Sequence, residues 1–305
     1  MRRVRGVVVI GVLALVSAAC GASGRGAEPH ASRTGTAGGE SVTERRWVAA
    51  GDFDAARFHR PTFMDNRWLP LEPGTRMVFR GHANDGRDRV TRRIVMTVTD
   101  LAKVVNGVRT RVIQELDFTA GALEEREIAF FAQDDSRNVW FFGEYPEEVE
   151  EGKIVKTPTW IAGIEGGRPG VFMHADALTG TPSYAEGWGP AVHWNDRARV
   201  YRVNQSTCVP VGCFRHVVVV EEFNPGEPGA FQLKYYAPGA GQVRVGWRGP
   251  NEEEQEALVL VDRGRLSGVG LERVRSEVLA EERRAYRHSP DVYALTPRII
   301  RPTSA

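Results

Sequence analysis

Alternation of apolar and polar side chains is the feature that most restricts the fold of this sequence. Across residues 89–99, the apolar residues Val90, Ile94, Met96 and Val98 all occupy even positions. Side chains of an extended chain point alternately to opposite faces, so this pattern predicts a β-strand with one buried face. Apolar residues at helical spacing do not appear until the carboxyl-terminal part of the chain. We therefore expect a mainly β fold.

A tight turn follows this strand at Asn106-Gly107. Both residues tolerate positive φ angles, which a type I′ turn requires, so the sequence predicts a β-hairpin here. Nine further β-prone segments lie between short turns rich in Gly, Pro, Asp and Asn: 76–80, 112–118, 125–132, 139–143, 198–203, 216–222, 231–236, 243–247 and 257–261. Strands at this spacing predict a strongly curved antiparallel sheet, a meander in the form of a half-barrel or open barrel.

One amphipathic helix is expected near the carboxyl terminus. Leu271, Val274, Val278 and Ala285 recur at helical spacing, with charged residues elsewhere around the helix. This pattern predicts a helix over about residues 270–286 that packs on the sheet. No low-complexity gap divides the chain after residue 47, so we expect a single β-rich domain over 47–288 and an irregular tail over 289–305.

The amino terminus has the pattern of a bacterial export signal. Three arginines precede an apolar run over residues 6–16, which ends in small residues directly before Cys20. The run is shorter than the ~20 residues that a membrane-spanning helix needs. Its end resembles a lipobox, although Ser17 stands where Leu or Val is usual. We expect a signal peptide over 1–19, lipidation of Cys20 with simple secretion as the alternative, and a flexible tether over 20–46.

Export predicts the location of the mature chain and the state of its other cysteines. We expect a protein lipid-anchored to the outer face of the bacterial cell membrane, in a compartment where thiols oxidise. Cys208 and Cys213 flank a short stretch and are expected to form a disulfide. Two thiols are too few for a zinc site, and the sequence implies no metal and no other cofactor. With 40 basic and 39 acidic residues, the chain lacks the positive field that binds nucleic acid.

Three stretches carry a family resemblance. They are Pro-Thr-Phe-Met-Asp-Asn-Arg-Trp-Leu-Pro-Leu-Glu-Pro-Gly-Thr at 61–75, Ala-Gln-Asp followed by Asn-Val-Trp-Phe-Phe-Gly-Glu within 132–144, and Lys-Tyr-Tyr-Ala-Pro-Gly at 234–239. The chain resembles a group of uncharacterised bacterial secreted proteins and lipoproteins, mostly actinobacterial. The resemblance implies the architecture, and that group has no known activity. Two departures are the missing Gly within 134–138 and the replacement of an acidic stretch at 189–196.

Four residues are weak candidates for acid–base catalysis: Glu144, His174, Asp176 and Glu186. Burial can raise a carboxyl pKa enough for such chemistry. The sequence has no HExxH, G-x-S-x-G, Walker or dinucleotide-binding motif, so an enzyme is the less favoured interpretation. Residues 134–138 have some of the oxygen ligands of a calcium loop but lack its Gly and its Glu, which favours a polar hairpin turn.

Aromatic residues are concentrated among glycines in the middle third of the chain. Seven of them are candidates for ligand contacts: Trp140, Phe142, Tyr145, Trp160, Tyr184, Trp188 and Trp194. Long Gly-rich loops with aromatic side chains suit a concave site over one face of a sheet. Packing in the protein core is the alternative explanation of the same residues.

These patterns together predict a cell-envelope lipoprotein that acts as a non-enzymatic binding or interaction module. A curved sheet offers a concave face, so the expected partner is an apolar ligand or another envelope protein. Two alternatives remain open. One is an extracytoplasmic hydrolase that uses the carboxylate and His candidates, and the other is a purely structural envelope protein.

Overall fold

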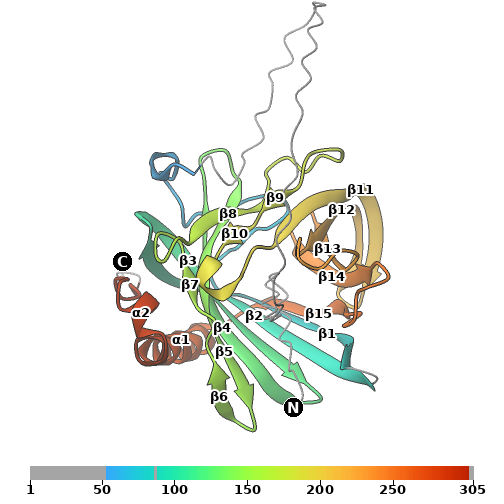
Figure 1. The fold of residues 1–305 in the computed structure, drawn as a ribbon. Coiled ribbons are helices and arrows are strands. Elements are labelled where there is room, and N and C mark those ends of the chain that lie inside the picture. Colours follow the sequence, from blue (N-terminus) through green and yellow to red (C-terminus); the bar gives the residue numbers. More distant parts are fainter. Residues whose placement is uncertain (1–52, 86–87, 302–305) are drawn as a thin grey trace, which may run out of the picture.

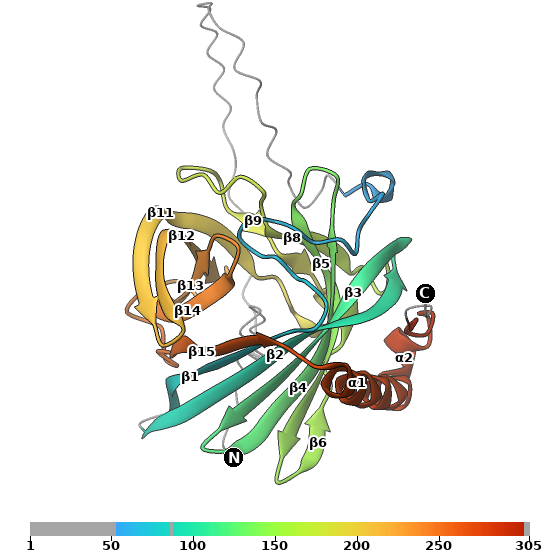
Figure 2. The same ribbon diagram turned by 180° about the vertical axis from the view of Figure 1, so that it is seen from behind.

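The structure is a computed structural model that describes residues 53–85 and 88–301 (Figure 1). The predicted signal peptide, Cys20 and the tether lie outside the described residues. Most of the described chain forms one antiparallel sheet that curves round a buried interior, and one long helix lies against the outside of this sheet (Figures 1 and 2). The predicted mainly β fold is confirmed.

The first half of the sheet is a meander in which each strand pairs antiparallel with the next. Its strands are β1 (Thr75–Asp85), β2 (Asp88–Val105), β3 (Val108–Thr119), β4 (Ala122–Gln133) and β5 (Val139–Glu150). The turn between β2 and β3 has φ angles of 47° at Asn106 and 79° at Gly107. Positive φ at both positions is what a type I′ turn requires, so the predicted hairpin is confirmed.

The second half is a similar meander that runs back to the first strand. Its strands are β11 (Arg197–Val209), β12 (Gly212–Phe223), β13 (Phe231–Ala237), β14 (Gly241–Arg248) and β15 (Ala257–Arg265). Because β15 pairs antiparallel with β1, the two meanders form one continuous sheet. All ten strands predicted from the sequence are present, most of them longer than the predicted segments.

Five short strands between the two meanders were not predicted. They are β6 (Lys153–Lys156), β7 (Trp160–Ile161), β8 (Arg168–Met173), β9 (Tyr184–Ala185) and β10 (Gly187–Trp188). β8 pairs with β5 and with β10, while β9 pairs with β11 and lies in contact with β8. The path of paired strands ends at β10 and at β9, so within the described residues the sheet curves without closing.

The predicted helix is α1 (Gly268–His288), which begins after Ser267, whose side chain accepts a hydrogen bond from the Gly270 amide. Its buried face includes Val274 and Val278 and packs on β2 and β4. The segment expected to be an irregular tail contains a short helix, α2 (Pro290–Tyr293), and Ile300 forms a β-bridge with Ala102. Within the described ranges, no helix has the length and apolar character needed to cross a membrane.

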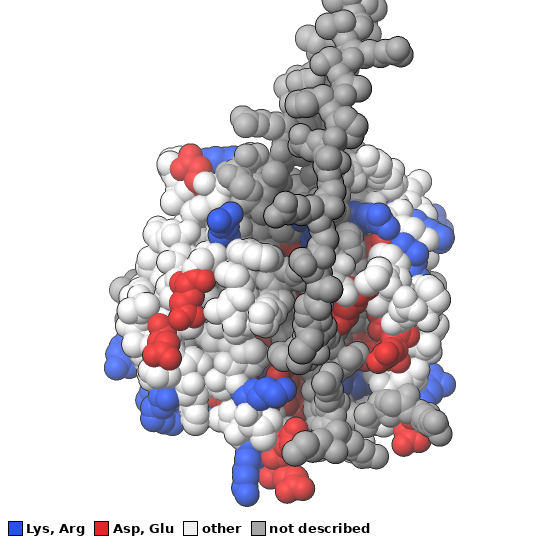
Figure 3. Space-filling model, viewed as in Figure 1, with Lys and Arg blue, Asp and Glu red and all other residues white. Residues whose placement is uncertain are grey.

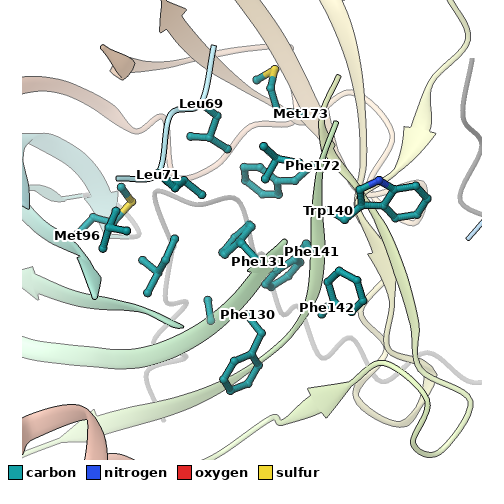
Figure 4. Close-up of a cluster of buried hydrophobic side chains, with 14 of the residues drawn as sticks. Leu69, Leu71, Met96, Phe130, Phe131, Trp140, Phe141, Phe142, Phe172 and Met173 are labelled. Carbon is teal, nitrogen blue, oxygen red and sulfur yellow. The ribbon is translucent and has the colours of Figure 1, made fainter. Parts of the chain in front are cut away.

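The two faces of the sheet are both covered. On one face, Phe79, Met96, Ile113 and Phe131 surround a small apolar space together with Phe172, which shows that strands from opposite sides of the curve meet there. We call this the interior face. Figure 4 shows Phe131, Phe141 and Phe172 gathered on one side of the strands, whereas Phe130, Trp140 and Phe142 point to the other side. We call that side the outer face, and α1 lies over part of it.

Candidate functional site

Acidic side chains line part of the interior face. Residues directly opposite each other in an antiparallel pair lie on the same face of a sheet. Glu115 is opposite Met96 on β2 and opposite Glu127 on β4, while Asp117 is opposite Ile94 and Glu125. Since Ile94 and Met96 face the interior, four acidic side chains from β3 and β4 face it too.

Acidic side chains also lie on the interior face of the neighbouring strands. Glu144 on β5 is opposite Ala129, which is itself opposite Ile113. On the second meander, Lys234 is opposite Val220 and Glu222 lies two residues further along β12. We define the carboxylate belt as the buried set Glu115, Asp117, Glu125, Glu127, Glu144, Glu186, Asp196, Glu222 and Glu256. Elsewhere, acidic and basic side chains are scattered over the surface seen in Figure 3.

Two basic side chains form ion pairs with the belt in the described part of the chain. The Arg92 guanidinium contacts the Asp117 carboxylate directly, and its Nε lies 3.6 Å from Glu256 Oε1. The Lys234 ammonium lies 3.6 Å from Glu222 Oε2 and is fully buried. The belt thus contains nine carboxyl groups and pairs with two cations. This is a large excess of acidic groups for a buried region, because burying a charge without a partner costs free energy.

Burial and mutual repulsion raise the pKa of these carboxyl groups. Burial, then the nearby Glu148 charge, raises the pKa of Glu125 to about 8. Burial raises the pKa of Glu222 to about 7 even though Lys234 opposes the change. For Glu144 and Glu186, burial followed by the charges of neighbouring acids raises the pKa well above its usual value. Much of the belt is therefore protonated at neutral pH and supplies hydrogen-bond donors as well as acceptors.

Three of the predicted aromatic residues adjoin the belt. Trp160 Nε1 donates a hydrogen bond of 3.1 Å to Glu144 Oε1. The Trp160 ring stacks on Trp194 with centroids 4.8 Å apart. Tyr184 is buried at the start of β9, two residues before Glu186, and its pKa is raised by burial and then by the charge of Glu186. The structure thus brings these aromatic residues together with two of the acid–base candidates.

The other aromatic candidates lie elsewhere. Trp140 and Phe142 pack on the outer face against Phe58, with ring centroids 5.9 and 5.7 Å away. Tyr145 is buried near α2, where its hydroxyl donates a hydrogen bond of 2.8 Å to Glu147. Trp188 is 42% exposed. The seven aromatic residues therefore do not form one continuous surface.

The remaining acid–base candidates differ in burial. His174 is buried, with its ring 4.5 Å from that of Tyr184, and burial lowers its pKa to about 4, so it is neutral at physiological pH. Asp176, two residues away, is exposed. The Asp134 carboxylate accepts hydrogen bonds from the Asn138 side chain and from Trp140 Nε1, within the polar turn that joins β4 to β5. Within residues 53–85 and 88–301, no group of three acidic, His or Cys side chains is arranged to hold a metal.

The predicted disulfide is present. Cys208 on β11 and Cys213 on β12 are opposite each other at the end of this hairpin and are covalently linked. The bond closes a small loop at the tip of two long strands, where it fixes their register. It supports a location in which thiols oxidise.

Sequence reasoning missed most of the belt. Arg92, Asp117, Glu127 and Lys234 lie within strands, where a polar residue at every second position normally indicates a solvent-exposed face. The available signal was Lys234, one of few lysines in the chain and placed among apolar and aromatic neighbours. A lone buried cation of this kind requires a buried acid beside it.

No protein-family model and no curated protein matches this chain. A solved structure from Bacteroides fragilis, described as an exported protein with a YmcC-like fold, is 15% identical, covers 65% of this chain and 99% of its own, and has a TM-score of 0.38. A Parabacteroides distasonis protein described as a lipoprotein is 10% identical over 65% of this chain and 98% of its own, with a TM-score of 0.31. Resemblances this weak support no statement about function.

Proposed function

We propose that this protein is an exported, lipid-anchored binding module of the cell envelope that holds its ligand against the carboxylate belt. The export-like amino terminus and the Cys208–Cys213 disulfide support the location. The buried acids support the site, because the described residues bury many more carboxyl groups than cations there and burying carboxyl groups costs stability. No metal, cofactor or nucleic acid is part of the proposal.

One observation carries the choice of ligand. Both carboxyl oxygens of Glu186 are buried and have no hydrogen-bond partner among the described residues, while the neighbouring Glu222 forms an ion pair of 3.6 Å with Lys234 through Oε2. The two carboxyl groups are close enough for the negative charge of Glu222 to raise the pKa of Glu186. Groups placed in this way fit a ligand that donates N–H hydrogen bonds and carries positive charge, such as an alkyl amine, whose apolar part would contact Tyr184.

A binding experiment tests this directly. Spermidine, titrated into the full exported protein at pH 7, should release heat with the native chain and bind more weakly to Glu186→Gln and Glu222→Gln. Glu165→Gln, which removes one exposed carboxylate, is the matched control and should bind like the native protein. Native mass spectrometry of protein purified from its own envelope should show a retained basic molecule. Absence of both signals would overturn the proposal.

A hydrolase is the second candidate, favoured by one pair of side chains. Glu127 and Glu144 lie on neighbouring strands, both are buried, and after burial the Glu144 charge is the largest cause that raises the pKa of Glu127. A pair of neighbouring carboxyl groups, one acting as acid and the other as base or nucleophile, is the usual means of glycoside hydrolysis. Release of nitrophenol from a panel of nitrophenyl glycosides, lost in Glu144→Gln, would favour this candidate. No release by the native protein would exclude these substrates and leave the binding module.

A further inference from the structure

A second site lies on the outer face, on the opposite side of the sheet from the belt. A cavity of about 680 Å³ is lined by residues of β1, β2, β3, β14 and β15. Strand register shows which side chains lie on the same face of the sheet as this cavity. Arg93 is opposite Arg80 on β1 and opposite Phe118 on β3. Val259 is opposite Arg80 on β1 and opposite Arg244 on β14. Arg80 therefore lies beside two arginine-bearing strands on one surface. The volume of this cavity is within the range of sites that bind drug-sized molecules.

Three arginines meet in this cavity without an acidic partner. Among the described residues, Arg80, Arg93 and Arg244 take part in no ion pair with Asp or Glu, while the nearby Asp262 carboxylate lies 3.5 Å from Arg76. Burial, followed by the like charges of Arg80 and Arg76, lowers the pKa of Arg93. The concentration of positive charge is therefore uncompensated within the described protein and favours a bound anion.

The arginines are also held in position. The Arg93 guanidinium lies 3.8 Å from the centre of the Phe118 ring, a cation–π contact that fixes its plane. Arg244 Nη2 donates a hydrogen bond of 2.9 Å to the carbonyl of Cys208, at the disulfide-closed tip of the β11–β12 hairpin. The Nε of Arg244 is buried without a hydrogen-bond partner. The Arg244 guanidinium is therefore held in place by one nitrogen, and its Nε–H can donate a hydrogen bond to a bound oxyanion.

Apolar side chains form part of the cavity wall, together with His82, Thr91 and Arg92. Phe118, Val259 and Val261 line it beside the arginines. We propose that this cavity binds an anionic amphiphile, with the guanidinium groups of Arg80, Arg93 and Arg244 on a phosphate group and with Phe118, Val259 and Val261 against its hydrocarbon chain. The cavity adjoins the carboxylate belt at Arg92, which pairs with Asp117, but its three other arginines lie on the opposite face of the sheet from the belt.

Dodecyl phosphate, below its micelle concentration, is the probe that tests this proposal. Isothermal titration of the full chain should show binding that weakens at least about tenfold in Arg93→Gln and in Arg244→Gln, because each loses a charge-assisted contact. Arg80→Gln removes an exposed side chain, so it tests the same contact with the least effect on folding. Arg283→Gln, on the exposed side of α1, is the control and should bind like the native protein. Circular dichroism establishes that each variant is folded.

Two further ligands make the experiment decisive. If inorganic phosphate binds as tightly as dodecyl phosphate, the apolar walls contribute nothing and the proposal is wrong. If dodecyl maltoside binds as tightly, the arginines contribute nothing and it is equally wrong. Flotation with phosphatidylcholine vesicles that contain phosphatidic acid identifies the source of the ligand. Vesicle binding that is lost in the arginine variants indicates a membrane phospholipid, and binding in solution alone indicates a soluble phosphate ester.

Discussion

Replacement of Glu281 by Gln should stabilise this protein at alkaline pH. Glu281 lies on the buried face of α1 and is 3% exposed. Its Oε1 accepts a hydrogen bond of 2.8 Å from Gln114 Nε2 on the outer face of the sheet, and its Oε2 is buried without a partner. Burial is the main cause that raises the pKa of Glu281 to about 8, because the charged form loses its hydration.

The size of the effect follows from this pKa. In the unfolded chain the carboxyl group titrates near 4.5, so below that pH the native state suffers no penalty from it. As the pH rises from 4.5 through about 8, the unfolded state releases a proton that the native state keeps, and the free energy of unfolding falls. At about 1.4 kcal/mol per pH unit, the loss is about 4 kcal/mol by pH 8 and under about 1 kcal/mol at pH 5.

Urea unfolding of both proteins at pH 5 and at pH 8 measures this difference. Gln has no charge to desolvate and can still pair with Gln114, so Glu281→Gln should exceed the unfolding free energy of the native protein by under about 1 kcal/mol at pH 5 and by about 4 kcal/mol at pH 8. Glu277→Gln, an exposed change on the same helix, is the control. A difference that stays the same at both pH values would show that nearby Arg284 and Arg126 keep Glu281 ionised in the native state, and would refute the reasoning.

Three further expectations follow from the structure, and one follows from the amino-terminal sequence. Gly107→Val should destabilise the fold by about 1 kcal/mol or more in urea unfolding, since a β-branched residue resists the positive φ of this turn. Trp194→Ala should cost about 3–5 kcal/mol because this side chain is fully buried, whereas Trp188→Ala should lower the melting temperature little. Cys213→Ser opens a short loop and should cost about 2 kcal/mol, with the linked peptide lost from a non-reducing digest. Cys20→Ser should release the protein from membranes and end its labelling by acyl chains.

The long strands could be predicted because their signals are local. Side-chain alternation marks β2, and the Asn106-Gly107 turn fixes where it ends. The five short strands have no such signal. β7 consists of two residues and pairs with β5 at Gly143, whose φ of 118° and lack of a side chain allow the close approach of Trp160 and Ile161. Pairing of this kind depends on tertiary contacts, which no short stretch of sequence specifies.

The candidate site was predictable only at its edge. Glu144, Glu186 and Trp160 were singled out from the sequence, and all three adjoin or belong to the belt. Its larger part, on β3 and β4, was invisible for a physical reason. Alternation shows which residues share a face of a strand, but the same pattern results whether the polar face meets solvent or the protein interior.

The helix decides between these two arrangements. On β4, Ile128 and Phe130 lie on the outer face, and Ile128 is opposite Gln114, which contacts Glu281 of α1. Because α1 covers this apolar side, Glu125 and Glu127 of the same strand must point into the curve of the sheet. An amphipathic helix on the convex side thus forces charged residues inward at the strands it covers. If Val278 of α1 were replaced by Asp, the helix should detach from the sheet, and hydrogen exchange should then increase first in β2 and β4, the strands on which α1 packs.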